Sequence, residues 1–258
     1  MKQRFLSGAV AAMLSLGTAH AADKPVRFIL VGDSTMASNS GYGDAFCARV
    51  NRAHTCINLA KGGRSSSSFR AEGRWDEVQG LLKGGAAYRA TYVLIQFGHN
   101  DQPGKPGRST DLKTEFPVNM ARYVDEVKAL DGMPVLVTPL TRRSFREGVL
   151  ENTLVPWADA IRAAAKEKQV PLLDLNADSY AAVQAMGEAE ADTFAVAPKP
   201  AAAPVAKGAG VEPQGAAKSA FDYTHLGAKG AKYFAAMVER ELKAAIPAIA
   251  AEFRPEGE

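Results

Sequence analysis

The sequence has few residues of the kinds that most often bind metals, with two cysteines and four histidines among 258 residues. Its histidine, cysteine, aspartate and glutamate residues do not follow the spacing of a zinc site or another metal site. No glycine-rich stretch has the pattern of a nucleotide-binding loop. We therefore expect neither a metal nor a cofactor.

Long apolar runs and a strong excess of charge are also absent beyond the first residues. Residues 1–21 combine Lys2 and Arg4 with an apolar stretch from Ala9 to Leu16 and then Ala19-His20-Ala21, which is the layout of a signal peptide. No later stretch is apolar enough to span a bilayer. Removal of this segment subtracts two positive charges, so the net charge falls from +3 to +1. We predict a periplasmic or secreted protein, and the near-neutral charge gives no reason to expect nucleic acid or an anionic membrane as a partner.

The cysteines, Cys47 and Cys56, would then fold in an oxidising compartment. They can form a disulfide if their Cα atoms lie within about 7 Å of each other, and two buried thiols are the alternative. The length of 258 residues suits one α/β domain with one sizeable core. Residues 22–258 are therefore predicted to form a single domain.

Short apolar runs alternate along the chain with helical patterns. The apolar runs are Val26–Val31, Cys56–Leu59, Tyr92–Phe97, Pro134–Thr138 and Val170–Leu175. The helical patterns are Tyr42–Arg52, Ser68–Leu82, Phe116–Leu130, Thr153–Gln169, Ala177–Met186 and Leu226–Ala245. This alternation predicts an α/β fold with a parallel sheet and helices on both of its faces. Ligands of such folds bind at the carboxyl ends of the strands.

A stretch at about 195–218 departs from this alternation. It is rich in alanine, proline, glycine and lysine and has no periodic apolar pattern, so it cannot bury a core face. We expect a flexible insertion that could act as a lid or substrate-gripping arm, because it leads directly into the segment Phe221–Gly227. A tolerated surface insertion is the alternative.

Gly32-Asp33-Ser34 directly follows the first predicted strand and places a serine hydroxyl at a strand end. Alone, this tripeptide is also ordinary turn chemistry. Three further segments follow it in chain order, namely Asn58–Phe69 (NLAKGGRSSSSF), Gln96–Asp101 (QFGHND) and Phe221–Gly227 (FDYTHLG). Together the four blocks resemble the SGNH hydrolases, also called the GDSL family. The longer matches GDSTMA, GGRSSSSF and FGHND resemble its rhamnogalacturonan acetylesterase branch more than its lipase or thioesterase branches.

The resemblance covers roughly residues 26–245, apart from the insertion. It implies a flavodoxin-like three-layer sandwich with a five-stranded parallel sheet, the SGNH hydrolase fold. It also implies a cofactor-independent serine esterase that removes acetyl groups from a pectic polysaccharide, rhamnogalacturonan. An esterase acting on acetylated xylan or small acetylated sugars is one alternative. An inactive carbohydrate-binding protein on the same scaffold is another.

A serine hydroxyl needs a base to activate it and a partner to orient that base. Three histidines follow the predicted signal peptide, and His54 lies away from every block, so we expect it on the surface. His225 follows Asp222 by three residues at a predicted helix start, which brings a carboxylate close to the imidazole N–H. The resemblance also places acid and base on this Asp-x-x-His pattern, so the expected catalytic residues are Ser34, Asp222 and His225. The alternative is that Asp222 only caps the last helix.

The resemblance also implies three donors to the oxyanion: the N–H groups of the serine and of a glycine, and an asparagine side chain. These positions match Ser34, Gly63 and Asn100. Gly63 is preferred because it directly precedes Arg64 in the run that matches the family, and Gly62 is the alternative. His99 is assigned a supporting role beside the oxyanion donor.

Several cations lie near the predicted site. A guanidinium group matches a carboxylate in geometry, so some of these arginines could hold substrate uronates. The expected substrate-binding set is Arg64, His99, Arg142 and Arg143. Trp75 and Trp157 lie in helical patterns and are expected in the core.

Overall fold

The structure is a computed structural model that describes residues 24–199 and 221–255. The predicted signal peptide, residues 1–21, and the part of the predicted insertion from 200 onward lie outside the described residues. The beginning of that insertion is described, and Ala195 forms an isolated antiparallel bridge with Leu226.

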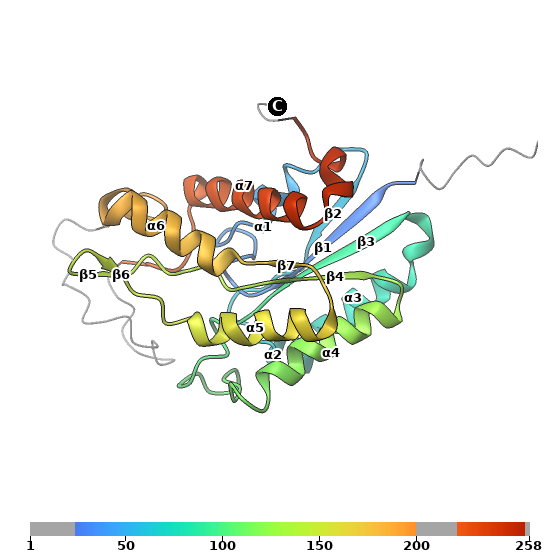
Figure 1. The fold of residues 1–258 in the computed structure, drawn as a ribbon, viewed down its shortest axis with the longest axis horizontal. Helices are drawn as coiled ribbons and strands as arrows, with labels where there is room; N and C mark the ends of the chain where they lie inside the picture. The colour runs from blue at the N-terminus through green and yellow to red at the C-terminus, as the bar shows by residue number, and fades with distance from the viewer. Residues whose placement is uncertain (1–23, 200–220, 256–258) are drawn as a thin grey trace, which may run out of the picture.

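A five-stranded parallel sheet forms the middle layer of the molecule (Figure 1). Its strands are β1 (Val26–Gly32), β2 (Thr55–Asn58), β3 (Ala90–Gln96), β4 (Met133–Val137) and β7 (Leu172–Leu173). The spatial order β2-β1-β3-β4-β7 is that of flavodoxin-like folds, so the predicted fold class is confirmed. Gly32 pairs with Gln96, which means that β1 and β3 end side by side.

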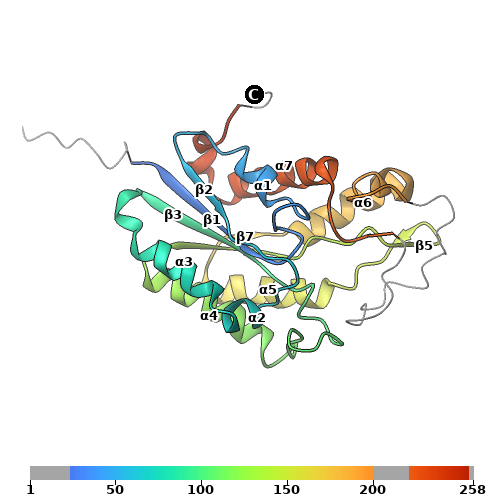
Figure 2. The ribbon, with the colours of Figure 1, turned by 180° about the vertical axis from the view of Figure 1, so that it is seen from behind.

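Helices cover both faces of the sheet (Figures 1 and 2). One face carries α1 (Gly43–Cys47), α6 (Leu175–Asp192) and α7 (Ala228–Ala245). The other carries α2 (Ser68–Ala71), α3 (Arg74–Lys83), α4 (Phe116–Ala129) and α5 (Val155–Lys168). Short elements complete the described chain: the hairpin of β5 (Phe145–Arg146) and β6 (Val149–Leu150), and the 3₁₀ helices η1 (Gly85–Ala87) and η2 (Pro247–Glu252).

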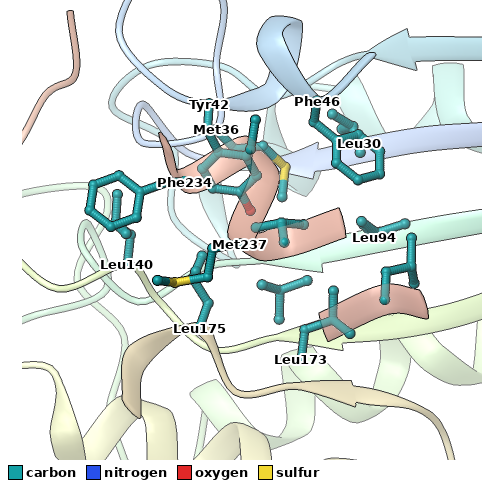
Figure 3. Close-up of a cluster of buried hydrophobic side chains, with 14 of the residues drawn as sticks. Leu30, Met36, Tyr42, Phe46, Leu94, Leu140, Leu173, Leu175, Phe234 and Met237 are labelled. Atoms are coloured by element: carbon teal, nitrogen blue, oxygen red, sulfur yellow. The ribbon is translucent and has the colours of Figure 1, made fainter. Parts of the chain in front are cut away.

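Strand β1 contributes to two hydrophobic cores because its side chains alternate between the faces of the sheet. Phe28 and Leu30 belong to the core under α7, whereas Ile29 and Val31 belong to the core on the α4 side. Figure 3 shows the first core, where Leu30 lies near Phe46 of α1. Burial on both faces explains why β1 reads as a continuous apolar run instead of an alternating one.

Some predicted boundaries are wrong. The predicted helix Ser68–Leu82 is two helices, because Gly73 has a φ of +73° and separates α2 from α3. The last strand is shorter than predicted and α6 starts at Leu175. The first helix ends at Cys47 instead of Arg52.

Cys47 and Cys56 form a disulfide with their Cα atoms 5.3 Å apart. This bond decides between the two alternatives left open by the sequence. It joins the end of α1 to β2, which is an edge strand of the sheet. The predicted core positions of Trp75 and Trp157 are confirmed, since these side chains are only 2% and 4% exposed.

Candidate active site

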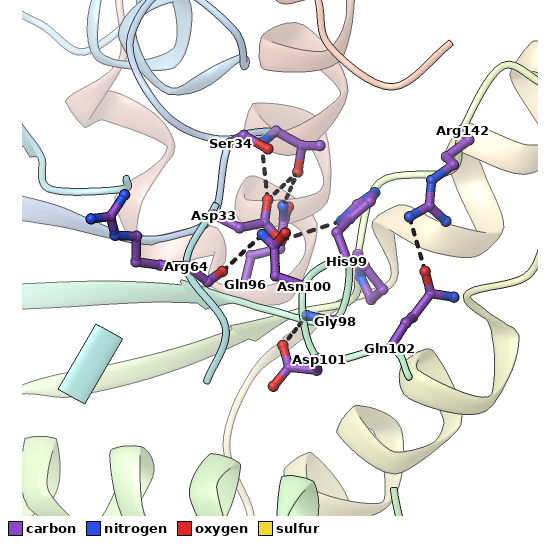
Figure 4. Close-up of polar contacts among 12 residues, drawn as sticks. Asp33, Ser34, Arg64, Gln96, Gly98, His99, Asn100, Asp101, Gln102 and Arg142 are labelled. Carbon is purple, nitrogen blue, oxygen red and sulfur yellow. Dashed lines mark hydrogen bonds and ion pairs between the residues drawn. The ribbon is translucent and has the colours of Figure 1, made fainter. Parts of the chain in front are cut away.

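The candidate nucleophile Ser34 lies two residues beyond the end of β1 in a tightly bonded turn (Figure 4). Asp33 Oδ1 accepts hydrogen bonds from the N–H of Thr35 at 2.9 Å and from its hydroxyl at 2.8 Å. The hydroxyl of Ser40 donates to the carbonyl of Ser34 at 2.7 Å. The turn is therefore fixed on both sides of the serine.

The glycine pair of the second block lies beside this serine. The N–H of Lys61 donates to the carbonyl of Gly32 at 2.9 Å, which ties the chain after β2 to the end of β1. A Cβ atom at Gly62 would lie 3.8 Å from Cβ of Ser34. Gly63 has a φ of +78°, a conformation that glycine adopts without the steric cost borne by other residues.

The third block is bonded to the second. Asn100 Nδ2 donates to the carbonyl of Arg64 at 3.0 Å (Figure 4). The buried carboxylate of Asp101 accepts from the N–H of Ser66 and from the N–H of Gly98, each at 3.0 Å. Burial raises the pKa of Asp101 to about 7, against the effect of these donors. Asp101 thus ties the two loops together.

His99 is buried behind the nucleophile turn and is only 2% exposed. Its Nδ1 lies 3.3 Å from Oδ2 of Asp33, a close ion-pair distance without the alignment of a hydrogen bond. Burial lowers the pKa of His99, which favours a neutral ring. This placement fits support of the Asp33 turn and leaves almost no surface for substrate, so the expectation of direct substrate binding by His99 is corrected.

The fourth block brings the candidate acid and base within hydrogen-bond distance of each other. Nδ1 of His225 lies 2.7 Å from Oδ2 of Asp222, and Oδ1 of Asp222 accepts the N–H of His225 at 2.9 Å. Burial would raise the pKa of Asp222, but these hydrogen bonds outweigh it and hold the pKa well below its ordinary value. The carboxylate therefore stays ionised beside the imidazole.

Two hydrogen bonds through Ser40 connect this pair to the nucleophile turn. The carbonyl of Ser40 accepts the N–H of Leu226 at 2.9 Å, and its hydroxyl donates to Ser34 as described above. No hydrogen bond joins the hydroxyl of Ser34 to the ring of His225, both of which lie in the described part of the chain. Catalytic hydrogen bonds are often long before substrate binds and shorten in the complex.

Arg143 is fully buried beneath the fourth block instead of facing a substrate. Its Nη2 donates to the carbonyls of Asp222 and His225, both at 2.9 Å. The main-chain N–H of Arg143 donates to the carbonyl of Tyr223 at 2.9 Å. Burial lowers its pKa to about 10, so the guanidinium remains charged at neutral pH. The expectation that Arg143 holds substrate carboxylates is therefore corrected, because the side chain is fully buried and its Nη2 donates to main-chain carbonyls.

The other two predicted arginines are partly buried and bonded within the protein. Nε of Arg64 pairs with Glu72 at 2.9 Å, and its Nη1 donates to the carbonyl of Gly62 at 2.7 Å. Arg142 donates to Oε1 of Gln102 at 2.9 Å and to the hydroxyl of Thr153 at 3.0 Å (Figure 4). Arg64 thus supports the glycine turn, while Arg142 supports the end of the third block.

His54 is partly buried, so its predicted surface position is wrong. Nδ1 of its ring accepts the N–H of Val26 at 3.3 Å, and Nε2 pairs with Glu252. It therefore links the start of β1 to η2, at the end of β1 opposite Ser34.

Sequence reasoning missed the roles of Ser40 and of two cations in the connection from β3 to α4, Lys105 and Arg108. Lys105 Nζ donates to the carbonyl of His99 at 2.6 Å, and Arg108 Nη1 donates to the carbonyl of Gly63 at 3.1 Å. The only signal in the sequence was the run PGKPGRS, which places both cations among turn residues just after the third block.

Two further kinds of feature do not occur in the described part of the chain. Within residues 24–199 and 221–255, no three histidine, cysteine, aspartate or glutamate side chains are grouped as a metal ion would require. No helix in the same ranges has the length and apolar character needed to cross a membrane.

Comparison with known proteins agrees with this arrangement of blocks. The model of the GDSL-like Lipase/Acylhydrolase family matches residues 30–233. The chain belongs to this family. Membership in the GDSL-like family identifies it as an enzyme that hydrolyses esters, as the four blocks predicted.

Three relatives illustrate how the chain compares with other proteins. Rhamnogalacturonan acetylesterase RhgT of Bacillus subtilis is 37% identical over 65% of this chain and 72% of its own length. The probable rhamnogalacturonan acetylesterase YesY of the same organism is 28% identical over 83% of this chain and 91% of its own. The structure of Axe2, an acetylxylan esterase from Geobacillus stearothermophilus, superposes with a TM-score of 0.56 at 16% identity. That superposition covers 84% of this chain and 93% of Axe2, and it supports the GDSL-like fold alone.

Proposed function

We propose that this protein is a carbohydrate O-acetylesterase that removes acetyl groups from rhamnogalacturonan through a Ser-His-Asp acyl-enzyme mechanism. The observation that carries the mechanism is the 2.7 Å pairing of His225 with Asp222, on a segment bonded through Ser40 to the turn of Ser34. The substrate is supported by the names of RhgT and YesY.

In the first half of the reaction, Oγ of Ser34 attacks the acetyl carbonyl carbon and Nε2 of His225 takes the hydroxyl proton. Asp222 holds the other ring nitrogen, which fixes the tautomer and stabilises the imidazolium that forms. The imidazolium then protonates the sugar oxygen as the bond to the acetyl carbon breaks. The products of this step are a free sugar hydroxyl and an acetyl ester of Ser34.

In the second half, His225 takes a proton from water, and the resulting hydroxide attacks the acetyl-serine. Collapse of this second intermediate returns the proton to Ser34 and releases acetate. Each tetrahedral intermediate carries a negative oxygen, for which the N–H groups of Ser34 and Gly63 and the amide of Asn100 serve as donors. One hydrogen of Asn100 Nδ2 binds the carbonyl of Arg64, which leaves the second for the oxyanion.

We also infer that the protein is exported to the periplasm or beyond. The support is the signal-like composition of residues 1–21, which lie outside the described residues, together with the disulfide of Cys47 and Cys56. A polymeric substrate is compatible with either location.

The test compares acetate release from acetylated rhamnogalacturonan, acetylated xylan and p-nitrophenyl acetate. The purified mature protein and its Ser34→Ala variant are assayed side by side. Serine-dependent release that favours rhamnogalacturonan is the expected result. A preference for acetylated xylan would contradict the proposed substrate. Acetate release that does not require Ser34 would contradict the proposed mechanism.

A further inference from the structure

Two cations that the proposed chemistry does not use lie against the candidate oxyanion hole. Lys105 and Arg108 belong to the connection from β3 to α4, which extends beyond the carboxyl edge of the sheet (Figures 1 and 2). Lys105 bonds to the carbonyl of His99, the residue before Asn100, and Arg108 bonds to the carbonyl of Gly63. Each cation therefore adjoins a segment that carries one of the candidate donors.

The connection that carries these cations is held in one shape by its own hydrogen bonds. The hydroxyl of Ser109 donates to the carbonyl of Gln102 at 2.8 Å and accepts the N–H of Lys105 at 2.9 Å. The N–H of Thr110 donates to the carbonyl of Asp101 at 2.9 Å. Because the loop is already ordered, a ligand would bind it at a small cost in conformational entropy.

Two arginines in the chain that follows β2 are paired with carboxylates, whereas Lys105 and Arg108 are not. Arg64 pairs with Glu72, and Arg70 pairs with Glu126. Among the described residues, no carboxylate lies within ion-pair distance of Lys105 or Arg108. Both are partly buried, and a partly buried cation bonded to only a carbonyl is stabilised further when an anion binds.

Charged groups of both signs surround Lys105. Burial and then the charge of Arg142 lower the pKa of Lys105 to about 8. The acidic groups that act in the opposite direction are Asp33 and Asp101. Both are fully buried, and both accept hydrogen bonds from neighbouring N–H and hydroxyl groups. Among the described residues, neither of them forms an ion pair with Lys105 or Arg108.

We propose that Lys105 and Arg108 bind the carboxylate of a uronate residue next to the acetylated sugar. This inference rests on the proposed function, since it concerns substrate recognition by the same site. A lysine ammonium has three N–H donors and an arginine guanidinium has five, and each uses one in the contacts described above. The remaining donors suit the two oxygens of a carboxylate.

Direct binding tests the site separately from the chemistry. Calorimetry measures an unacetylated galacturonate oligosaccharide binding to the Ser34→Ala protein, with and without the additional changes Lys105→Gln and Arg108→Gln. We expect Kd to rise by about tenfold or more when both cations are removed, since such a change corresponds to about 1.4 kcal/mol. The matched control is Lys113→Gln, which removes one exposed charge from the same connection and should leave Kd near its original value. Absence of binding to the parent protein, or equal binding by all variants, would overturn the proposal.

Kinetics then distinguishes carboxylate recognition from an effect on the oxyanion hole. The ratio of kcat/KM on acetylated rhamnogalacturonan to kcat/KM on the same polymer with reduced carboxyl groups is measured for each protein. The double variant is expected to lose most of the preference for the anionic polymer, and Lys105→Gln alone to lose part of it. An equal loss on both polymers would place these residues in support of the loop and overturn the carboxylate site. Oligosaccharide binding without acetate release would instead overturn the proposed esterase function and leave the binding site standing.

Discussion

Nη2 of Arg143 lies 2.9 Å from the carbonyl oxygen of His225 and donates a hydrogen bond to it. The same nitrogen donates to the carbonyl of Asp222 at 2.9 Å. One buried guanidinium therefore holds the main chain at both ends of the segment that carries the candidate acid and base. Their position depends on a residue from the chain beyond β4, far away in the sequence.

The change Arg143→Lys should reduce kcat on p-nitrophenyl acetate by about 10²-fold and change KM little, because small displacements of a catalytic group cost this much. A lysine keeps the charge but lacks the planar fork that reaches both carbonyls. Steady-state kinetics gives the rates, and circular dichroism establishes that the variant is folded. Arg146→Lys is the control, since Arg146 is exposed and pairs with Glu151 at 2.7 Å. A folded Arg143→Lys protein with the parent kcat would contradict the positioning role.

The change Asp222→Asn should reduce kcat by roughly 10²-fold to 10⁴-fold, because an amide does not hold the imidazole in the required tautomer. The low pKa of Asp222 keeps the parent carboxylate ionised throughout the practical assay range. Stopped-flow or steady-state hydrolysis of p-nitrophenyl acetate measures the loss. Asp159→Asn, which removes an exposed carboxylate paired with Arg162, serves as the control. Full activity of Asp222→Asn would rule out the triad.

Glu241 in α7 should make the protein less stable as pH rises. Both of its carboxylate oxygens are buried without a hydrogen-bond partner among the described residues. Burial, followed by the charges of Asp178 and Asp174, raises its pKa from 4.5 to about 8. The folded protein thus retains a proton that the unfolded chain releases, so the free energy of unfolding falls between about pH 4.5 and pH 8.

Glu241→Gln resembles the protonated side chain and should remove this loss of stability. The gain in Tm over the parent should be small near pH 5 and should grow as pH rises to 8. Thermal unfolding followed by circular dichroism across this range measures it. Glu167→Gln changes an exposed carboxylate of α5 and is expected to show no such trend. A Tm difference that stays constant with pH would show that Glu241 does not titrate in this window.

Lys105 should make recognition of the anionic polymer dependent on pH. Its pKa is lowered to about 8 by burial, Arg142 and Arg108, with Asp33 and Asp101 acting in the opposite direction. Since a lowered lysine pKa means that positive charge is lost as pH rises, KM for acetylated rhamnogalacturonan should increase above pH 8. The carboxyl-reduced polymer should show no matching increase.

Lys105→Arg provides the sharper version of this experiment, because arginine stays charged throughout the range. Its KM for the anionic polymer should change less between pH 7 and pH 9 than that of the parent. Initial rates are corrected for base-catalysed ester hydrolysis with an enzyme-free blank at each pH. Identical profiles for the two proteins would assign the pH dependence to another group.

The sequence predicted the sheet and the order of the blocks because both depend on local patterns. Buried parallel strands read as apolar runs, and each of the first three blocks begins where such a run ends. The division at Gly73 was missed because the apolar pattern continues from α2 into α3, while the break depends on one backbone torsion. The disulfide was left open because a spacing of nine residues does not determine the distance between two Cα atoms.

The roles of the cations were harder to predict because they depend on distant partners. Arg143 follows a strand end, as a substrate-binding arginine would, but its contacts with the fourth block turn it inward. Arg108 bonds to Gly63 across 45 positions of sequence. Neither contact leaves a periodic signal. The sequence therefore indicates which charged residues lie at the edge of the sheet, but it does not show which way their side chains point.

The hydrogen bonds of Ser40 with Leu226 and Ser34 join the first strand's end to the segment just before the last long helix. The two halves of the candidate site are thus far apart in the sequence, since 191 positions separate Ser34 from His225. A ribosome must synthesise the chain as far as the fourth block before they can meet. Premature termination between the first and the fourth block would leave a fragment with Ser34 but without His225. Appearance of esterase activity during cell-free synthesis would consequently mark the moment at which translation has passed the fourth block and the two segments have folded together.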